Sequence, residues 1–180
     1  FRLSDITMGM MANPFFIDLG YTKTEIASVA KVYGFFMTIC GAFICGLFVS
    51  KISIFLSLFF GGIIVCLSNL LFYFLAGSEP KLFYLITVIS FDNFAGGFAS
   101  TAFIAYLSGL TDKSYTATQY ALFSSLMTLP GKFFSGFSGL LVDSFGYQDF
   151  FMISAVVGLP GILMVFWLFL INQQLTKNSG

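Results

Sequence analysis

Three ionisable side chains lie inside apolar segments of this 180-residue chain, each about two or more helical turns from the nearest polar turn. They are Lys31, Asp92 and Lys132, and two amides, Asn93 and Gln119, accompany them. Ammonium groups can bind an anion, and the amides suit sugar hydroxyls or peptide groups. A charge within a membrane segment marks a functional site by default. The alternative is that these polar side chains only fasten neighbouring helices together.

The composition of the chain places these segments in lipid. Hydrophobic residues make up 58% of it and charged residues 9%, and its mean hydropathy is +0.94. A soluble domain of this size could not bury so much apolar surface. Because a spanning helix takes about 20 apolar residues and a turn, the chain holds roughly six spans and no soluble domain. We therefore expect an all-α integral membrane protein, with residues 1–180 forming one transmembrane bundle.

Apolar segments separated by polar turns supply the expected spans. They cover residues 3–19, 25–51, 52–78, 82–110, 116–142 and 150–175. The segments at 52–78 and 150–175 carry no charge, and we expect them to face lipid. The other four carry ionisable residues, which in the first segment is Asp5 near its start, and we expect them to line a polar space. This division into lining helices and outer helices is typical of one half of a secondary transporter.

Charges in the turns predict the orientation of the spans. With the N-terminus in the cytoplasm, positive residues on the inside outnumber those on the outside. Inside are Arg2, Lys51, Lys113 and Lys177, and outside are Lys23 and Lys81. Both ends of the chain are therefore expected in the cytoplasm. The chain begins with Phe1 and Arg2 in or just before its first helix, as we expect of a fragment.

Several classes of function are disfavoured by what the chain contains. Its net charge is zero and it has no basic run, which argues against nucleic acid as a partner. It has no His, which excludes imidazole catalysis and most zinc sites. Cys40, Cys45 and Cys66 lie within apolar spans, where cysteines act as small packing groups. We predict no catalytic residue, metal site or cofactor, and a membrane enzyme would lack both His and a long loop to carry its site.

Two connecting loops resemble those of the major facilitator superfamily. Residues 46–51, G-L-F-V-S-K, resemble its G-x-x-x-D-[RK] loop, with Ser50 where the acid would stand. Residues 139–151, G-L-L-V-D-S-F-G-Y-Q-D-F-F, are similar to the G-x-x-x-[DE]-x-x-G-[WY]-x-x-F-[FY] connection before the last helix of those transporters.

Further motifs resemble one branch of that superfamily, the AmpG-type muropeptide permeases. The motifs are F-D-N-F-A-G-G at 91–97, T-A-F-I-A-Y-L at 101–107 and T-A-T-Q-Y-A-L-F-S-S-L at 116–126. Residues 3–5, 14–20 and 25–31 look like that family's seventh helix, the following turn and the start of its eighth. The resemblance therefore covers nearly the whole chain. This chain departs from the pattern at Asp92, Lys132 and Asp143, where Glu, Arg and Glu are common.

The resemblance implies the C-terminal half, helices seven to twelve, of a transporter in the bacterial inner membrane. Such a transporter brings anhydromuropeptides, which are anionic glycopeptides of cell-wall recycling, into the cytoplasm and is driven by the proton gradient. Its partners would be the lipid bilayer, the substrate and an N-terminal six-helix half, in the same chain or a separate one. Two alternatives are a transporter of another anionic solute, such as an acyl-CoA, and a non-transporting relic of a split permease.

The charged residues then have a predicted arrangement. Lys31, Asp92 and Lys132 are expected to face one central cavity, because charges that face lipid are hard to sustain. One lysine would pair with Asp92, and the other would bind a carboxylate of the substrate. Asn93 and Gln119 complete the predicted substrate-binding set.

Overall fold

The computed structural model describes residues 2–110 and 116–178, and these fold almost entirely into helices. In chain order they are α1 (Arg2–Asp18), α2 (Lys23–Val29), the π-helical turn η1 (Ala30–Gly34), α3 (Phe35–Lys51), α4 (Ile54–Ala76), α5 (Leu82–Leu110), α6 (Thr116–Ser135) and α7 (Ser138–Asn178). The predicted all-helical architecture is confirmed. The turn that holds Lys113 lies outside the described residues.

The second predicted span is one continuous rod made of α2, η1 and α3, from Lys23 to Lys51. A capping box begins it: the Thr22 hydroxyl accepts a hydrogen bond from the Glu25 N–H, and the Glu25 carboxylate accepts one from the Thr22 N–H. The rod thus begins two residues before the predicted start at 25. The π turn within it was not predicted.

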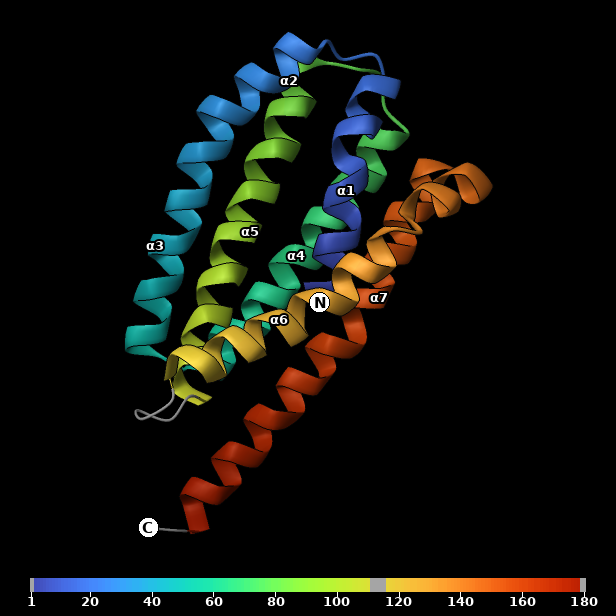
Figure 1. Cartoon of the computed structure of the whole chain (residues 1–180). Coiled ribbons are helices and arrows are strands. Elements are labelled where there is room, and N and C mark those ends of the chain that lie inside the picture. Colours follow the sequence, from blue (N-terminus) through green and yellow to red (C-terminus); the bar gives the residue numbers. More distant parts are fainter. Residues whose placement is uncertain (1, 111–115, 179–180) are drawn as a thin grey trace.

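The run predicted as one helix at 116–142 is divided. Helix α6 ends at Ser135, and Gly136 and Phe137 form a turn whose N–H groups bond to carbonyls three residues back. The helix resumes at Ser138 and turns back at Gly146, whose φ of 79° favours glycine. The reversal therefore lies inside the turn predicted at 143–149, and the last long helix begins before the predicted residue 150. Figure 1 shows this last part running back along the bundle.

Close approach of α3 to α5 depends on glycine. A Cβ on Gly41 would lie 2.2 Å from the Phe94 carbonyl oxygen, and one on Gly97 would lie 2.2 Å from the Thr38 carbonyl oxygen. Any larger side chain would push the backbones apart, as in other small-residue contacts between membrane helices. The two helices run side by side in Figure 1.

Helix α4 packs between α5 and α7. Its buried residues are Ser57, Leu58, Gly61, Gly62, Val65, Ser68, Asn69, Phe72 and Leu75. The expectation that this uncharged segment faces lipid is therefore wrong for one whole side of the helix. Counting charges missed the contact because glycine, serine and an amide, which need no charge, make close helix packing favourable.

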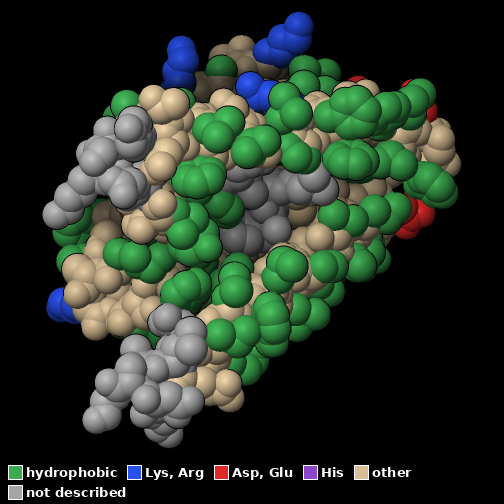
Figure 2. Space-filling model, turned by 60° about the horizontal axis from the view of Figure 1, so that its bottom comes forward, with side chains coloured by type: hydrophobic (Ala, Val, Ile, Leu, Met, Phe, Trp, Pro, Cys, Tyr) green, Lys and Arg blue, Asp and Glu red, His purple; other side chains and the backbone are tan. Residues whose placement is uncertain are grey.

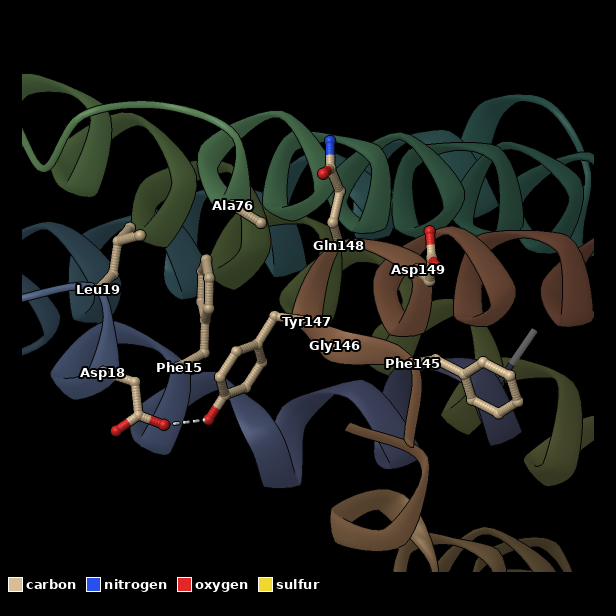
Figure 3. A pocket seen from close by; sticks show the side chains of 9 residues that line it. All are labelled: Phe15, Asp18, Leu19, Ala76, Phe145, Gly146, Tyr147, Gln148 and Asp149. Carbon is tan, nitrogen blue, oxygen red and sulfur yellow. Dashed lines mark hydrogen bonds between the residues drawn. The ribbon is translucent and has the colours of Figure 1, made fainter. Parts of the chain in front are cut away.

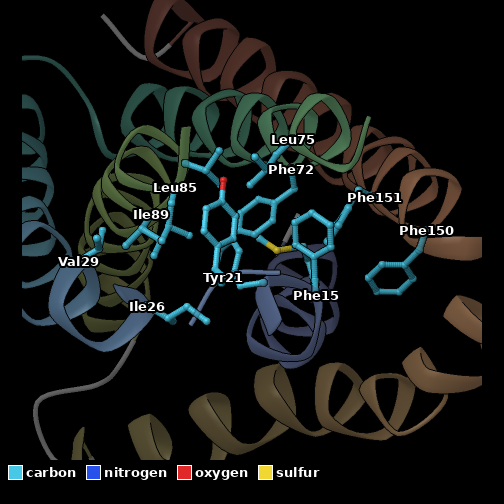
Figure 4. Close-up of a cluster of buried hydrophobic side chains, with 13 residues drawn as sticks. Phe15, Tyr21, Ile26, Val29, Phe72, Leu75, Leu85, Ile89, Phe150 and Phe151 are labelled. Atoms are coloured by element: carbon cyan, nitrogen blue, oxygen red, sulfur yellow. The ribbon is translucent and has the colours of Figure 1, made fainter. Parts of the chain in front are cut away.

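An aromatic cluster joins the end of α1 to α4 and α7 (Figure 4). The rings of Phe15 and Phe151 meet edge to face with centroids 4.8 Å apart, and those of Phe16 and Phe72 stack at 5.6 Å. Beside it, the Tyr21 hydroxyl donates a hydrogen bond to the Lys81 carbonyl oxygen at 2.9 Å, and burial raises the pKa of Tyr21. The cluster and this bond hold the two turns at this end of the bundle together.

Among the described residues, four helical segments are long and apolar enough to cross a membrane: 23–51, 54–76, 82–110 and 138–171. Large hydrophobic side chains also cover much of the outer surface, as Figure 2 shows for one face, with the visible Lys, Arg, Asp and Glu near its edges. An apolar exterior of this kind is what a lipid environment requires.

Candidate functional site

A polar pocket of about 350 Å³ lies between α1, α3 and α5. Its lining consists of Asp5, Thr38, Ala42, Asp92, Asn93, Gly96, Gly97, Ser100 and Thr101. Asp92 is ten residues into α5, so at 1.5 Å per residue it lies about 15 Å from the start of that helix, near the middle of a bilayer. Of the predicted site residues, Asp92 and Asn93 line this pocket.

The Asp92 carboxyl is held by a neighbouring helix. Ser68 of α4 donates a hydrogen bond from its Oγ to Asp92 Oδ1 at 2.8 Å. Asp5 of α1 lines the same pocket, so two carboxyls from different helices face one space. Ser68 was missed from the sequence, although a Ser-Asn pair in the middle of an uncharged span was a visible signal of a polar contact.

Asn93 connects α5 to α3. Its amide nitrogen donates to the Ile89 carbonyl oxygen at 2.8 Å, and its Oδ1 accepts a hydrogen bond from the Thr38 hydroxyl at 3.2 Å. Gly34 leaves room for this side chain, since a Cβ there would lie 3.2 Å from the Asn93 amide carbon. The amide thus fastens two helices together and lines the pocket at the same time.

The other predicted residues lie elsewhere on the described part of the chain. Lys31 is exposed in η1, Lys132 is exposed in the last turn of α6, and Gln119 is half-buried near the start of α6. Neither lysine lines the pocket, and among the described residues no ion pair joins either of them to Asp92. Beside Lys132, Gly131 packs against Ile6 of α1, so this lysine lies next to the α1–α6 contact.

A second polar cluster joins α1, α4 and α7. Asn69, which is fully buried, donates from its amide nitrogen to Ser4 Oγ at 2.7 Å, and Ser4 Oγ donates to the Ser154 carbonyl oxygen. The Asn69 Oδ1 has no hydrogen-bond partner among the described residues. We assign this cluster to helix packing, because it lies between helices that the aromatic cluster also holds together.

At the C-terminal end of α1 a further pocket, of about 410 Å³, opens beside the reversal at Gly146 (Figure 3). There the Tyr147 hydroxyl donates a hydrogen bond to Asp18 Oδ2 at 2.6 Å and ties the end of α1 to α7. Among the described residues, no group of three or more His, Cys, Asp or Glu is placed to hold a metal ion.

Comparison with known proteins agrees with the resemblance found in the sequence motifs. The model of the Major Facilitator Superfamily matches residues 3–180. A relative in Rickettsia conorii, named "Putative transporter AmpG 4", is 36% identical over 168 residues, which are 93% of this chain and 41% of the relative. "Putative transporter AmpG 1" of Rickettsia prowazekii is 36% identical over 92% of this chain and 37% of its own length.

The "Anhydromuropeptide permease" of Escherichia coli is 29% identical over 166 residues, which are 92% of this chain and 34% of the permease. The chain thus spans well under half the length of the relatives it matches. These matches confirm the resemblance to AmpG-type permeases. The chain belongs to the Major Facilitator Superfamily and is a multi-pass protein of the bacterial inner membrane.

Proposed function

We propose that this chain is the C-terminal six-helix half of a secondary transporter that imports anhydromuropeptides across the inner membrane. The name of the Escherichia coli relative supports the substrate, and the fraction of each relative that the chain covers supports a half. Within residues 2–110 and 116–178, four apolar helical segments are long enough to span the membrane. In the proposal, α1 and α6 are the remaining spans, and a second six-helix half, covalent or separate, completes the transporter.

The observation that carries this proposal is the polar pocket around Asp92, which lies about 15 Å deep in a helix of the bundle. A carboxyl at the middle of a bilayer costs about 2.5–3.5 kcal/mol on insertion scales, so it is kept where it has a function. The hydroxyls of Thr38, Ser100 and Thr101 and the Asn93 amide suit the hydroxyls of a sugar and the amides of a peptide.

We propose proton coupling through Asp92. A serine hydroxyl can donate to a carboxylate and can accept from a carboxylic acid, so Ser68 can remain hydrogen-bonded to Asp92 in both protonation states. Protonation would remove the charge at mid-bilayer and thereby favour the rearrangement that carries the site across the membrane.

Lys31 and Lys132 have a separate role in the proposal. Each would bind a carboxylate of the substrate on the surface that the second half covers, outside the pocket around Asp92. Gln119 would contribute an amide to the same surface. The whole site would then combine an acidic pocket around Asp92 with two basic residues outside that pocket.

Two rival readings use the same fold: transport of another anionic solute such as an acyl-CoA, and a relic that transports nothing. The relatives are named transporters and permeases, which supports a transporter over an enzyme. The test is uptake of labelled anhydromuropeptide by this chain together with an N-terminal half. We expect saturable uptake that a protonophore abolishes and that Asp92→Asn reduces strongly. Uptake of acyl-CoA in its place would favour the first rival, and no uptake of either would favour the second.

A further inference from the structure

A π-helical turn, η1, interrupts the second span between α2 and α3. The turn covers Ala30–Gly34 and contains Lys31, eight residues and about 12 Å from the start of the rod at Lys23. A π turn closes its hydrogen bonds over five residues where an α-helix uses four, so it adds one residue to the rod. Such turns are frequent at functional sites.

The added residue lets the buried residues on both sides of the turn face the same helix, α5. Before the turn, Ile26 and Val29 are buried, and after it Gly34, Gly41 and Cys45 are buried. Val29 and Gly34 are five residues apart, and in a regular α-helix two such positions point about 140° apart. Both nevertheless face α5, since Val29 shares a buried cluster with Ile89 (Figure 4) and Gly34 packs on Asn93.

The residue that the π turn adds to the rod also affects where Lys31 lies. Lys31 precedes Gly34 by three residues, and positions three apart share one face of an α-helix. An unbroken helix that kept Gly34 against α5 would therefore turn the ammonium toward α5, where Ile89 is buried, and one that kept Val29 there would instead lose the Gly34 contact. In the structure Lys31 is exposed instead.

Polar contacts hold the turn in this geometry. The Thr38 hydroxyl donates to the Gly34 carbonyl oxygen at 2.9 Å and also lies 3.2 Å from Asn93 Oδ1. The carbonyl at the end of the turn is thus fixed to the same pair of side chains that joins α3 to α5.

We infer that η1 is a positioning device: its extra residue keeps the Lys31 ammonium off the α3–α5 contact and presents it to an anionic group of the transported substrate. The role toward substrate depends on the proposed function. The geometry does not, and it can be tested without transport.

The geometric test uses pairs of cysteines in this chain in bacterial membranes, with Cys40, Cys45 and Cys66 replaced by Ala. A short bifunctional thiol reagent should link Val29→Cys to Ile89→Cys and should leave Lys31→Cys with Ile89→Cys unlinked. Efficient linking of the Lys31 pair in the intact chain would overturn the inference, whether or not the protein transports.

Two matched deletions sharpen the test. Removing Ala30 or removing Val32 turns the five-residue turn into an α-helical one and leaves Val29 and Gly34 four residues apart, on one face. Without Ala30, Lys31 still precedes Gly34 by three residues and turns toward α5. Without Val32, it precedes Gly34 by two residues and points away. Linking of the Lys31 pair should therefore appear only when Ala30 is removed.

The functional test measures anhydromuropeptide uptake in the two-half protein. Lys31→Met and the deletion of Ala30 should each raise KM about tenfold or more, as expected for a lost charge-assisted hydrogen bond. Their combination should add nothing further, because both remove one ammonium from the site. Lys31→Arg and the deletion of Val32 should keep most of the affinity. Equal KM for the two deletions would overturn the role of the turn. If neither deletion variant inserts into the membrane, two other results decide: the difference in KM between Lys31→Met and Lys31→Arg, and the cysteine linking in the chain with its turn intact.

Discussion

Ser68 of α4 donates a hydrogen bond to Asp92 of α5 at 2.8 Å, and this bond joins an uncharged helix to the acidic residue of the polar pocket. The contact gives α4 a role beyond facing lipid. It also means that the environment of Asp92 can be changed without touching Asp92 itself.

Ser68→Ala should therefore weaken both stability and transport. The substitution leaves the carboxyl without this donor, which costs about 1–3 kcal/mol for a buried polar group. Thermal unfolding in detergent and uptake by the two-half protein measure the two effects. Ser78→Ala is the matched control, because within the described part of the chain the Ser78 hydroxyl bonds only to the Phe74 carbonyl oxygen at its own helix end, and that bond is exposed. Equal behaviour of the two variants would contradict a role for the Ser68–Asp92 bond.

Neighbouring glycines of α5 give a second, purely structural prediction. Gly97→Ala should lower the free energy of unfolding by about 1–3 kcal/mol, because its Cβ would lie 2.2 Å from the Thr38 carbonyl oxygen and must force α3 and α5 apart. Gly96→Ala should leave stability nearly unchanged, since a Cβ there meets nothing within 4 Å. Unfolding of both variants in the same detergent tests the pair. Equal loss at the two positions would contradict a specific role for the α3–α5 contact, because helix propensity favours Ala over Gly and cannot produce a loss.

The sequence predicted most of the helices well, because long apolar segments between polar turns have few other solutions in lipid. The predicted span at 82–110 coincides with α5, and the span at 25–51 differs from the observed rod by two residues. Asp92 and Asn93 line one polar pocket because adjacent residues of one helix remain close, and their role in binding substrate stays a prediction.

Other features depend on tertiary contacts that a single sequence does not display. The burial of α4 follows from Gly61, Gly62 and Ser68, which look neutral on a hydropathy scale. The π turn lets the buried residues on both sides of it meet α5, and the five-residue step from Val29 to Gly34 becomes recognisable only once their burial is known. The position of Lys31 outside the α3–α5 contact depends on that turn.

The orientation of the bundle can be tested at the turn between α4 and α5. A cysteine at Glu79 should react with a membrane-impermeant thiol reagent only from the periplasmic side, and one at Ser50 only from the cytoplasmic side. Both residues are exposed at opposite ends of helices, which makes them a matched pair. Labelling in right-side-out and inverted vesicles measures both. Modification of the Glu79 position from the cytoplasm would invert the proposed topology.

This chain by itself should not transport. Alternating access in this superfamily rocks one six-helix half against the other around a site at their interface, so a single half has only part of the cavity wall. Proteoliposomes that contain only this chain should show no uptake above protein-free vesicles, and adding an N-terminal half should restore it. Uptake by the monomeric chain alone would refute the two-half proposal, whereas uptake by a homodimer would mean that a second copy supplies the missing wall.

Lys132 provides the last prediction, because it is exposed and makes no ion pair with a described residue. Lys132→Leu should leave membrane expression unchanged and should cut uptake of an anionic substrate by about tenfold, the effect of one lost charge-assisted contact. Lys132→Arg should keep much of the uptake, and Lys23→Leu, at the outer start of α2, should keep nearly all of it. A lysine that only packed helices would instead change expression or stability and leave KM unaltered. Wild-type uptake by a variant with Leu at both Lys31 and Lys132 would therefore refute the idea that these charges bind the substrate.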